Sequence, residues 1–306
     1  MASTPDAPTP PPPLPQPTWL QSLGQWLRQP GFISASPVLI FFLIGFVGPL
    51  VIVLGFSFLP ERTFGFHGDW TVDNYVHILS ESYWIPFVWS FGLATATVAC
   101  CLLISYPVSY GLARIFGRWA APVMLLLVIP LFVSENVRLF GWYLVLLKGG
   151  GILAGSTQAL FGFDTGTLLY SPGTILMGMV YVYLPYTLFP TTLGLSLVPR
   201  DQMDAASDLG ANRWQIFREV ELPIAMPGIL IGSLLTFVLA VGAISEAKLL
   251  GGANIVVVAH AILHEFTYAQ NWPLGSAISM FAIAITGILV IFIMRRLDLD
   301  RLLGRK

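Results

Sequence analysis

Long apolar runs separated by short polar segments dominate this chain. A helix needs about 20 apolar residues to cross the hydrocarbon core of a bilayer, which is about 30 Å thick. The run Ala120–Leu147 has this length, although it contains Glu135 and Arg138. The other runs of sufficient length carry no charge: Pro37–Leu59, Ile85–Leu112, Leu168–Val198, Leu222–Ser245 and Trp272–Met294. The pattern therefore predicts six transmembrane helices.

The uncharged segment Leu249–His264 would make a seventh span, but it is short and Gly251–Gly252 interrupts it. Cytoplasmic loops of membrane proteins collect Lys and Arg. Six spans with an internal N-terminus place most of the 15 basic residues in the cytoplasm, including the tail that ends at Lys306. A seventh span would move that tail outside. We therefore expect six spans, both termini in the cytoplasm, and external segments at about residues 60–84, 148–167 and 246–271.

Composition supports an all-α integral membrane protein, because 56% of the residues are hydrophobic and only 10% are charged. A soluble domain carries roughly 25% charged residues. The proline-rich start cannot bury a core, so we expect a cytoplasmic tail and pre-span segment at 1–32 and a six-span domain at 33–306. The net charge of -1 gives no indication of nucleic acid. We find neither a GxxxxGK[ST] phosphate loop nor a catalytic Ser/His/Asp or Cys/His arrangement, which argues against an ATPase or another enzyme.

The cytoplasmic loop between the fourth and fifth spans, residues 199–222, has the pattern of two short capped helices. Asp201 is predicted to cap the first helix. Gly210 stands where a helix C-cap needs a positive φ. Asn212 is predicted to cap a second helix from Arg213 to about residue 219, and Pro223 to open the fifth span. Such a rigid pair of helices suits a docking element, although an amphipathic connector on the membrane surface would show a similar pattern.

The same loop contains a pattern with several fixed positions, namely Asp204-Ala205-Ala206, Gly210-Ala211, Phe217, Val220 and Leu222-Pro223. In this pattern the loop resembles the EAA loop of binding-protein-dependent ABC importer permeases. Asp204 stands where the family usually has Glu, which keeps the charge but shortens its reach. The resemblance implies that the loop docks on a cytoplasmic ATPase, which binds ATP and Mg, and carries its closure to the membrane helices. The residues predicted to couple to the ATPase are Asp204, Ala205, Ala206, Gly210, Ala211, Arg213, Phe217 and Pro223.

Further segments are similar to the spermidine/putrescine group of these permeases, namely Ile129–Leu147, Tyr181–Pro190, Leu249–Asn254 and Asn271–Ser279. The resemblance implies a type I ABC importer permease fold in a bacterial inner membrane. It also implies a second permease subunit in a heterodimer, two ATPase subunits and an external binding protein. Polyamine is the leading substrate, with iron(III), sulfate, molybdate and organophosphonate as alternatives. A secondary transporter without ATP is a further alternative, but it would predict internal repeats, which we do not find.

Several polar residues in or beside the apolar runs are candidates for the translocation pathway. Glu135 and Arg138 share a helix face and can pair. The pair either lines the pathway or fastens the outer gate, or it only holds helices together. The tyrosines of the fourth span either pack the bundle or border the pathway on a bent helix. Glu246 either attracts a cation at the external mouth or is an interfacial residue without such a role. The candidates are Glu135, Arg138, Tyr181, Tyr183, Tyr186 and Glu246.

His260 and His264 are one helical turn apart, with Glu265 next to them. An HxxxH pair can supply two zinc ligands, but nothing in the sequence completes an HExxH arrangement. We therefore interpret them as histidines of an external loop. The sequence predicts no metal site and no cofactor in this chain.

Overall fold

The computed structural model describes residues 30–66, 68–80, 82–147, 151–153, 155–156, 168–252 and 254–296. These residues form helices, turns and loops, and no strand occurs among them. The predicted tail up to residue 29, most of the predicted external segment 148–167 and the C-terminal tail from residue 297 lie outside the described residues. Contacts divide the chain into two units, Met1–Ile52 and Val53–Lys306.

The N-terminal span is a nearly continuous helix. It consists of α2 (Pro30–Phe42), the π-helical turn η1 (Leu43–Val47) and α3 (Gly48–Phe56). The stretch Ala35–Phe56 has a mean hydropathy of 2.8, and none of its side chains is buried. Because a helix this apolar is not stable facing water, its surface requires lipid or another protein chain.

The second unit contains the remaining helices of the described chain. They are α4 (Asp73–Ser80), α5 (Trp84–Tyr110), η2 (Gly111–Ile115), η3 (Gly117–Trp119), α6 (Ala120–Val128), η4 (Ile129–Phe132), α7 (Glu135–Leu146), α9 (Pro172–Ser196), α10 (Arg200–Asp208), α11 (Arg213–Ile216), η5 (Phe217–Glu221), α12 (Leu222–Val241), α13 (Ser245–Leu250), α14 (Val258–Thr267) and α15 (Trp272–Arg296).

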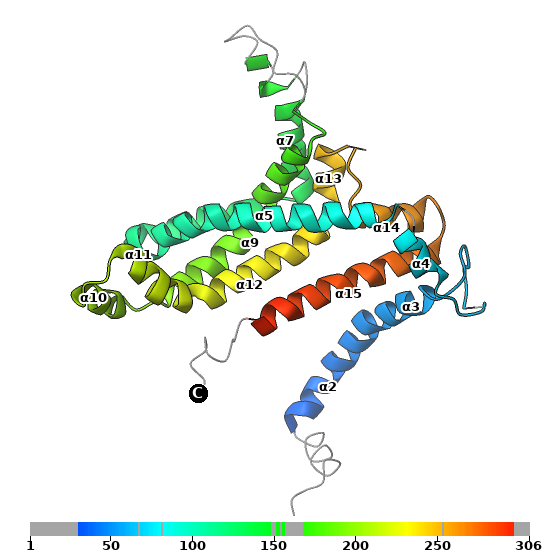
Figure 1. The fold of residues 1–306 in the computed structure, drawn as a ribbon, viewed down its shortest axis with the longest axis horizontal. Helices are drawn as coiled ribbons and strands as arrows, with labels where there is room; N and C mark the ends of the chain where they lie inside the picture. The colour runs from blue at the N-terminus through cyan, green and yellow to red at the C-terminus, as the bar shows by residue number, and fades with distance from the viewer. Residues whose placement is uncertain are drawn as a thin grey trace, which may run out of the picture. The chain divides into compact units, whose positions relative to one another are not determined.

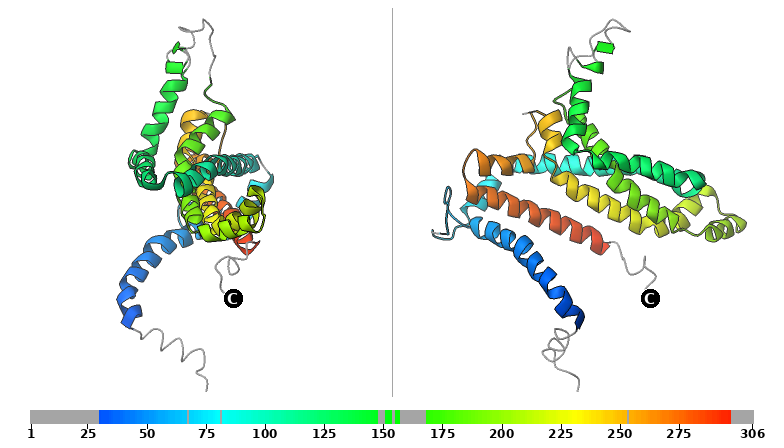
Figure 2. Two further views of the ribbon diagram at one scale, coloured as in Figure 1. Left: turned by 90° about the vertical axis from the view of Figure 1, so that its left-hand side faces the viewer. Right: turned by 180° about the vertical axis from the view of Figure 1, so that it is seen from behind.

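The centre of this unit is a three-helix layer in which α9 packs against both α5 and α12 (Figures 1 and 2). Its core contains Leu93 of α5, Ile175, Met179 and Val182 of α9, and Ala240 of α12. These side chains are 7% exposed or less. Since α9 is covered from both sides, it is the most enclosed of the candidate spans.

Glycines allow α9 and α12 to approach closely. A Cβ on Gly194 would lie 2.7 Å from the Ala225 carbonyl oxygen and 3.0 Å from the Gly228 Cα. Next to this contact, the hydroxyls of Thr187 and Thr236 form a buried hydrogen bond of 2.6 Å. Small residues and hydroxyl pairs of this kind hold membrane helices together where no hydrophobic driving force between helices exists.

The third apolar run does not form the continuous helix that its hydropathy predicts. The helical segment Gly117–Phe132 and α7 meet at an angle of 91°. Val133 is extended, with φ -94° and ψ 133°, and Ser134 follows with ψ 135°. Two residues with such ψ values end the hydrogen-bond ladder, so α7 leaves the direction of the bundle (Figure 1).

The number of spans agrees with the prediction. The described chain has five helical stretches long and apolar enough to cross a membrane, and six if the bent pair counts as one span. The segment Leu249–His264, which we did not predict as a span, divides between α13 and α14. The loop helices α10 and α11 lie at one end of the bundle, and α4 and α14 at the opposite end (Figure 1).

Candidate functional site

The first helix of the 199–222 loop begins two residues earlier than predicted. α10 starts at Arg200, and its N-cap is Pro199 in an extended conformation, without a side-chain cap. The prediction of Asp201 as N-cap is therefore wrong. Asp201 lies instead in the first turn of α10, where a carboxylate is stabilised by the helix dipole.

The turn between the two loop helices has the predicted capping chemistry. Gly210 has a φ of +86°, and its N–H donates to the Ser207 carbonyl at 2.9 Å. The Ala211 N–H donates to the Ala206 carbonyl at 3.0 Å. These two bonds form a Schellman motif. Asn212 then caps α11 through a complete capping box with Gln215, so the predicted roles of Gly210 and Asn212 in helix capping are confirmed.

The second loop helix does not end before the fifth span. α11, η5 and α12 form one continuous helical stretch, Arg213–Val241. Pro223 does stand at the beginning of α12, but it follows the π-helical turn η5, in which the Leu222 N–H donates to the Phe217 carbonyl. Proline removes one backbone donor and crowds the preceding turn, and the wider π turn occurs directly before it. The second loop helix and the fifth span are thus one continuous helix.

The loop presents an exposed surface with two large apolar side chains. Leu209 is 89% exposed and Trp214 is 66% exposed. The predicted residues Asp204, Ala205 and Gly210 are exposed beside them. Sequence reasoning did not select Leu209. Its position at the C-cap of α10, next to the αL glycine, was the available signal.

The inner side of the loop is tied to the bundle. Met203 of α10 packs against the buried cluster that contains Leu195 and Ala225. The rings of Phe217 and Tyr106 of α5 lie 5.5 Å apart between their centroids. Arg114 of η2 donates to the Val198 carbonyl at 2.8 Å. The loop is therefore in direct contact with the cytoplasmic-loop ends of α5, α9 and α12.

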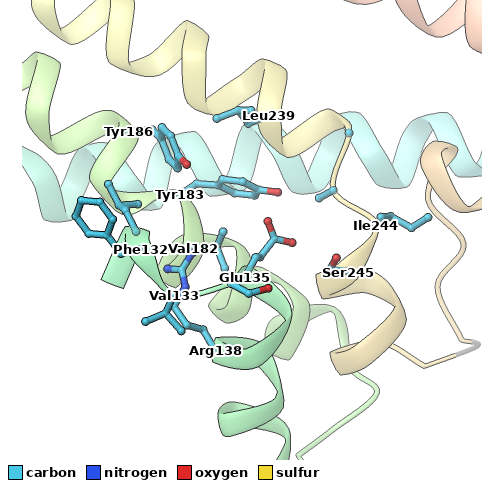
Figure 3. A pocket seen from close by; sticks show the side chains of 14 residues that line it. Phe132, Val133, Glu135, Arg138, Val182, Tyr183, Tyr186, Leu239, Ile244 and Ser245 are labelled. Carbon is cyan, nitrogen blue, oxygen red and sulfur yellow. The ribbon is translucent and has the colours of Figure 1, made fainter. Parts of the chain in front are cut away.

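The break in the third apolar run opens a cavity of about 740 Å³. It brings together four of the six predicted pathway residues, which lie far apart in the sequence. Glu135 and Arg138 come from the start of α7, whereas Tyr183 and Tyr186 come from the middle of α9. Figure 3 shows their side chains around one space, closed on another side by Leu239 of α12.

Arg138 has a different partner from the one predicted. No ion pair between Glu135 and Arg138 is present in the part of the chain that the structure describes. The Arg138 guanidinium carbon lies 5.6 Å from the ring centroid of Tyr181, and Arg138 Nε has no hydrogen-bond partner among the described residues. Tyr181 does not line the cavity, and its contact with the cavity residues is through this cation–π interaction.

Glu246 lies directly behind the cavity wall, next to the lining residue Ser245. Its side chain is 0% exposed, and neither carboxylate oxygen has a hydrogen-bond partner among the described residues. Burial, with a smaller effect from the Glu135 carboxylate, raises the pKa of Glu246 to about 7. A buried carboxylate without a partner is unfavourable, so the neutral form of this group persists to a higher pH than in water.

A layer of membrane helices with a polar cavity among them, and a rigid loop with an exposed apolar tip at one end, defines a transport subunit of the permease class. The model of the family described as "Binding-protein-dependent transport system inner membrane component" matches residues 32–301. The chain belongs to this family and is a permease subunit, not an enzyme. It is a multi-pass inner-membrane component of a transport system that works with a binding protein.

Relatives and solved structures agree with this assignment. The chain is 33% identical over 266 residues to the spermidine/putrescine transport system permease protein PotB of Haemophilus influenzae, with 84% of this chain and 90% of that protein covered. It is 28% identical over 260 residues to PotB of Escherichia coli, with 84% and 93% covered. A bacterial ABC transporter that imports the acidic polysaccharide alginate has the same fold, with a TM-score of 0.65, 16% identity, and 90% and 98% of the two chains covered.

Proposed function

We propose that this chain is the permease subunit that carries a polyamine across the inner membrane. The observation that supports this most directly is the buried, unpartnered carboxylate of Glu246 behind a cavity that also holds Glu135. The PotB relatives, which match most of the chain, are named as spermidine/putrescine permeases. Both the local chemistry and the relatives thus favour a cationic aliphatic substrate.

The cavity has the groups that a polyamine needs. Protonated amines are attracted by carboxylates, and the rings of Tyr183 and Tyr186 add cation–π attraction. Leu131 and Leu239 provide apolar surface for the hydrocarbon segments between amines. Arg138 opposes this attraction, because a second cation in the cavity repels the first. We infer that it keeps binding weak enough for release, as transport requires.

The coupling role of the loop remains part of the proposal. The exposed tip with Leu209 and Trp214 docks on a cytoplasmic ATPase, and α11 moves with the fifth span because they form one helix. Two such ATPases, a second permease subunit in a heterodimer and an external binding protein complete the transporter. In this arrangement both termini lie in the cytoplasm. When the ATPases close, the cavity changes from being accessible from the cytoplasm to being accessible from the outer side of the membrane.

We expect Glu246→Gln to raise the KM for spermidine uptake by about tenfold, the equivalent of ~1.4 kcal/mol of binding free energy. The substitution keeps the shape of the side chain but removes the charge that the amine would neutralise. Uptake of labelled spermidine by cells expressing the complete transporter measures this effect. Glu61→Gln is the matched control, because Glu61 is exposed and should leave KM unchanged.

The pH dependence gives a second readout for the same residue. With a pKa of about 7, the Glu246 carboxyl is largely neutral below this pH and ionised above it. The primary amines of a polyamine stay protonated through this range, as lysine does. Wild-type KM should therefore fall as the pH rises from about 6 to about 8, and the Gln variant should lack this change. A Gln variant with wild-type KM and pH dependence would contradict the proposal, as would wild-type uptake of molybdate but not of spermidine.

A further inference from the structure

A second cavity, of about 870 Å³, lies at the end of the bundle opposite the loop helices. We call it the outer cavity. It is formed where the beginning of α5 faces α14, and it shares no lining residue with the cavity at Glu135. The lining residues that matter here are Tyr83, Trp84, Val256, His260, His264 and Glu265.

Glu265 is the charged group of the outer cavity. Its side chain is buried, at 6% exposure for the residue. Its Oε1 atom accepts a hydrogen bond from the Tyr83 hydroxyl at 3.2 Å and lies 3.3 Å from His264 Nδ1. No hydrogen bond to its Oε2 atom occurs among the described residues. The Tyr83 hydroxyl and the His264 ring both contact Oε1, and a buried carboxylate is stabilised by further hydrogen bonds or a positive charge.

A second polar atom at the outer cavity is also unpartnered. His260 Nδ1 is buried and has no hydrogen-bond partner among the described residues. The His260 ring lines the cavity, and in a neutral imidazole one ring nitrogen is an acceptor, so a rotation of the ring would present this acceptor to a ligand. The apolar part of the lining consists of Trp84, Ile85, Pro86 and Val256 together with Ala261. These residues give the cavity an aromatic and aliphatic wall.

We propose that the outer cavity binds an alkylammonium group. An ammonium supplies a positive charge next to the Glu265 carboxylate. Its three N–H groups can donate hydrogen bonds to Glu265 Oε2 and His260 Nδ1. The aromatic faces of Tyr83 and Trp84 favour a cation, and the apolar wall accepts the attached carbon chain. An anion would be repelled by Glu265. No group of three His, Cys, Asp or Glu side chains suited to a metal ion occurs among the described residues.

Two molecules at the outer face of the membrane carry this chemistry. One is a free polyamine, held before it enters the pathway, and the other is the headgroup of phosphatidylethanolamine. Both place a primary ammonium on an aliphatic carbon chain. Neither the coupling loop nor the cavity at Glu135 is needed for this site, so it can exist even if the transported solute is not a polyamine.

The test uses the complete transporter in lipid nanodiscs, without binding protein and without ATP. All samples carry Glu246→Gln, which is expected to weaken spermidine binding at the cavity lined by Glu135. In phosphatidylcholine nanodiscs, binding of labelled spermidine is measured by scintillation proximity. In nanodiscs that contain phosphatidylethanolamine, retained lipid is counted by native mass spectrometry. The variants are Glu265→Gln, which removes the charge, and Val256→Trp, which fills the cavity without changing Glu265. Glu61→Gln is the control.

If the ligand is a free polyamine, Glu265→Gln and Val256→Trp should each lower spermidine affinity by at least about tenfold, while Glu61→Gln has no effect. If the ligand is the lipid headgroup, the same two variants should lose retained phosphatidylethanolamine and leave spermidine binding unchanged. Either result supports an alkylammonium site. The proposal is overturned if neither variant changes the binding of either ligand.

Discussion

Gly210→Arg is expected to reduce uptake by at least about 100-fold while the subunit remains in the membrane. Gly210 has a φ of +86°, a conformation that costs an L-residue roughly 1–2 kcal/mol. A Cβ at this position would meet no atom of the chain within 4 Å, so the subunit itself should still fold. The arginine would instead extend from the exposed tip, next to Leu209 and Trp214, into the space of the docked ATPase. Uptake, together with ATPase activity stimulated by the binding protein, measures the effect.

Gly210→Asn separates the backbone from the surface contribution. Asparagine tolerates positive φ better than other side chains, and it is much shorter than arginine. We expect this variant to keep most of the uptake. Equal uptake by wild type and Gly210→Arg, at equal abundance in the membrane, would mean that the loop does not dock there.

The membrane spans could be predicted from sequence because the bilayer imposes a length on every apolar helix. The break in the third span could not be predicted in this way. Hydropathy indicates which segments are buried in the membrane, but it contains no information on backbone dihedral angles. Val133, where the helix breaks, is as apolar as the residues that precede it. The continuity of α11 with the fifth span was missed for a related reason. Pro223 indicated a helix boundary, whereas the π turn before it allows the helix to continue.

The candidate site was predictable residue by residue but not as an arrangement. Glu135 and Glu246 stand out because a charge in or beside an apolar run requires a partner or a function. The closeness of Glu246 to the cavity that Glu135 lines depends on the turn at Val133 and on the packing of α7 beside α13 and α9, which join distant parts of the chain. The loop was more predictable, since Gly210 and Asn212 act through hydrogen bonds to residues close in sequence. The outer cavity was not predicted. The sequence indicated that His260 and Glu265 lie in an external segment, but not that this segment packs against the beginning of α5.

Gly228→Leu is expected to prevent stable folding of the permease. Gly228 lies where α12 crosses α9, and a Cβ there would overlap the Pro190 carbonyl oxygen and lie 2.7 Å from the Gly194 Cα. Both atoms belong to the backbone, so no side-chain rotation can make room. Overpacking of this kind typically costs about 1–3 kcal/mol or more. Here the helices must also separate, which would break the buried Thr187–Thr236 hydrogen bond.

Abundance in the membrane and thermal stability in detergent measure this effect, and Gly287→Leu is the matched control. Gly287 lies in α15, where a Cβ would meet nothing within 4 Å, so the same substitution should leave the subunit stable. Gly228→Ala should have an intermediate effect, because it adds the Cβ without the rest of the leucine side chain. A Gly228→Leu subunit as abundant and as stable as the Gly287→Leu control would show that α9 and α12 do not pack through these glycines. The close contact between α9 and α12 would then have to depend on other residues, such as Gly232 of α12 beside Thr187 of α9.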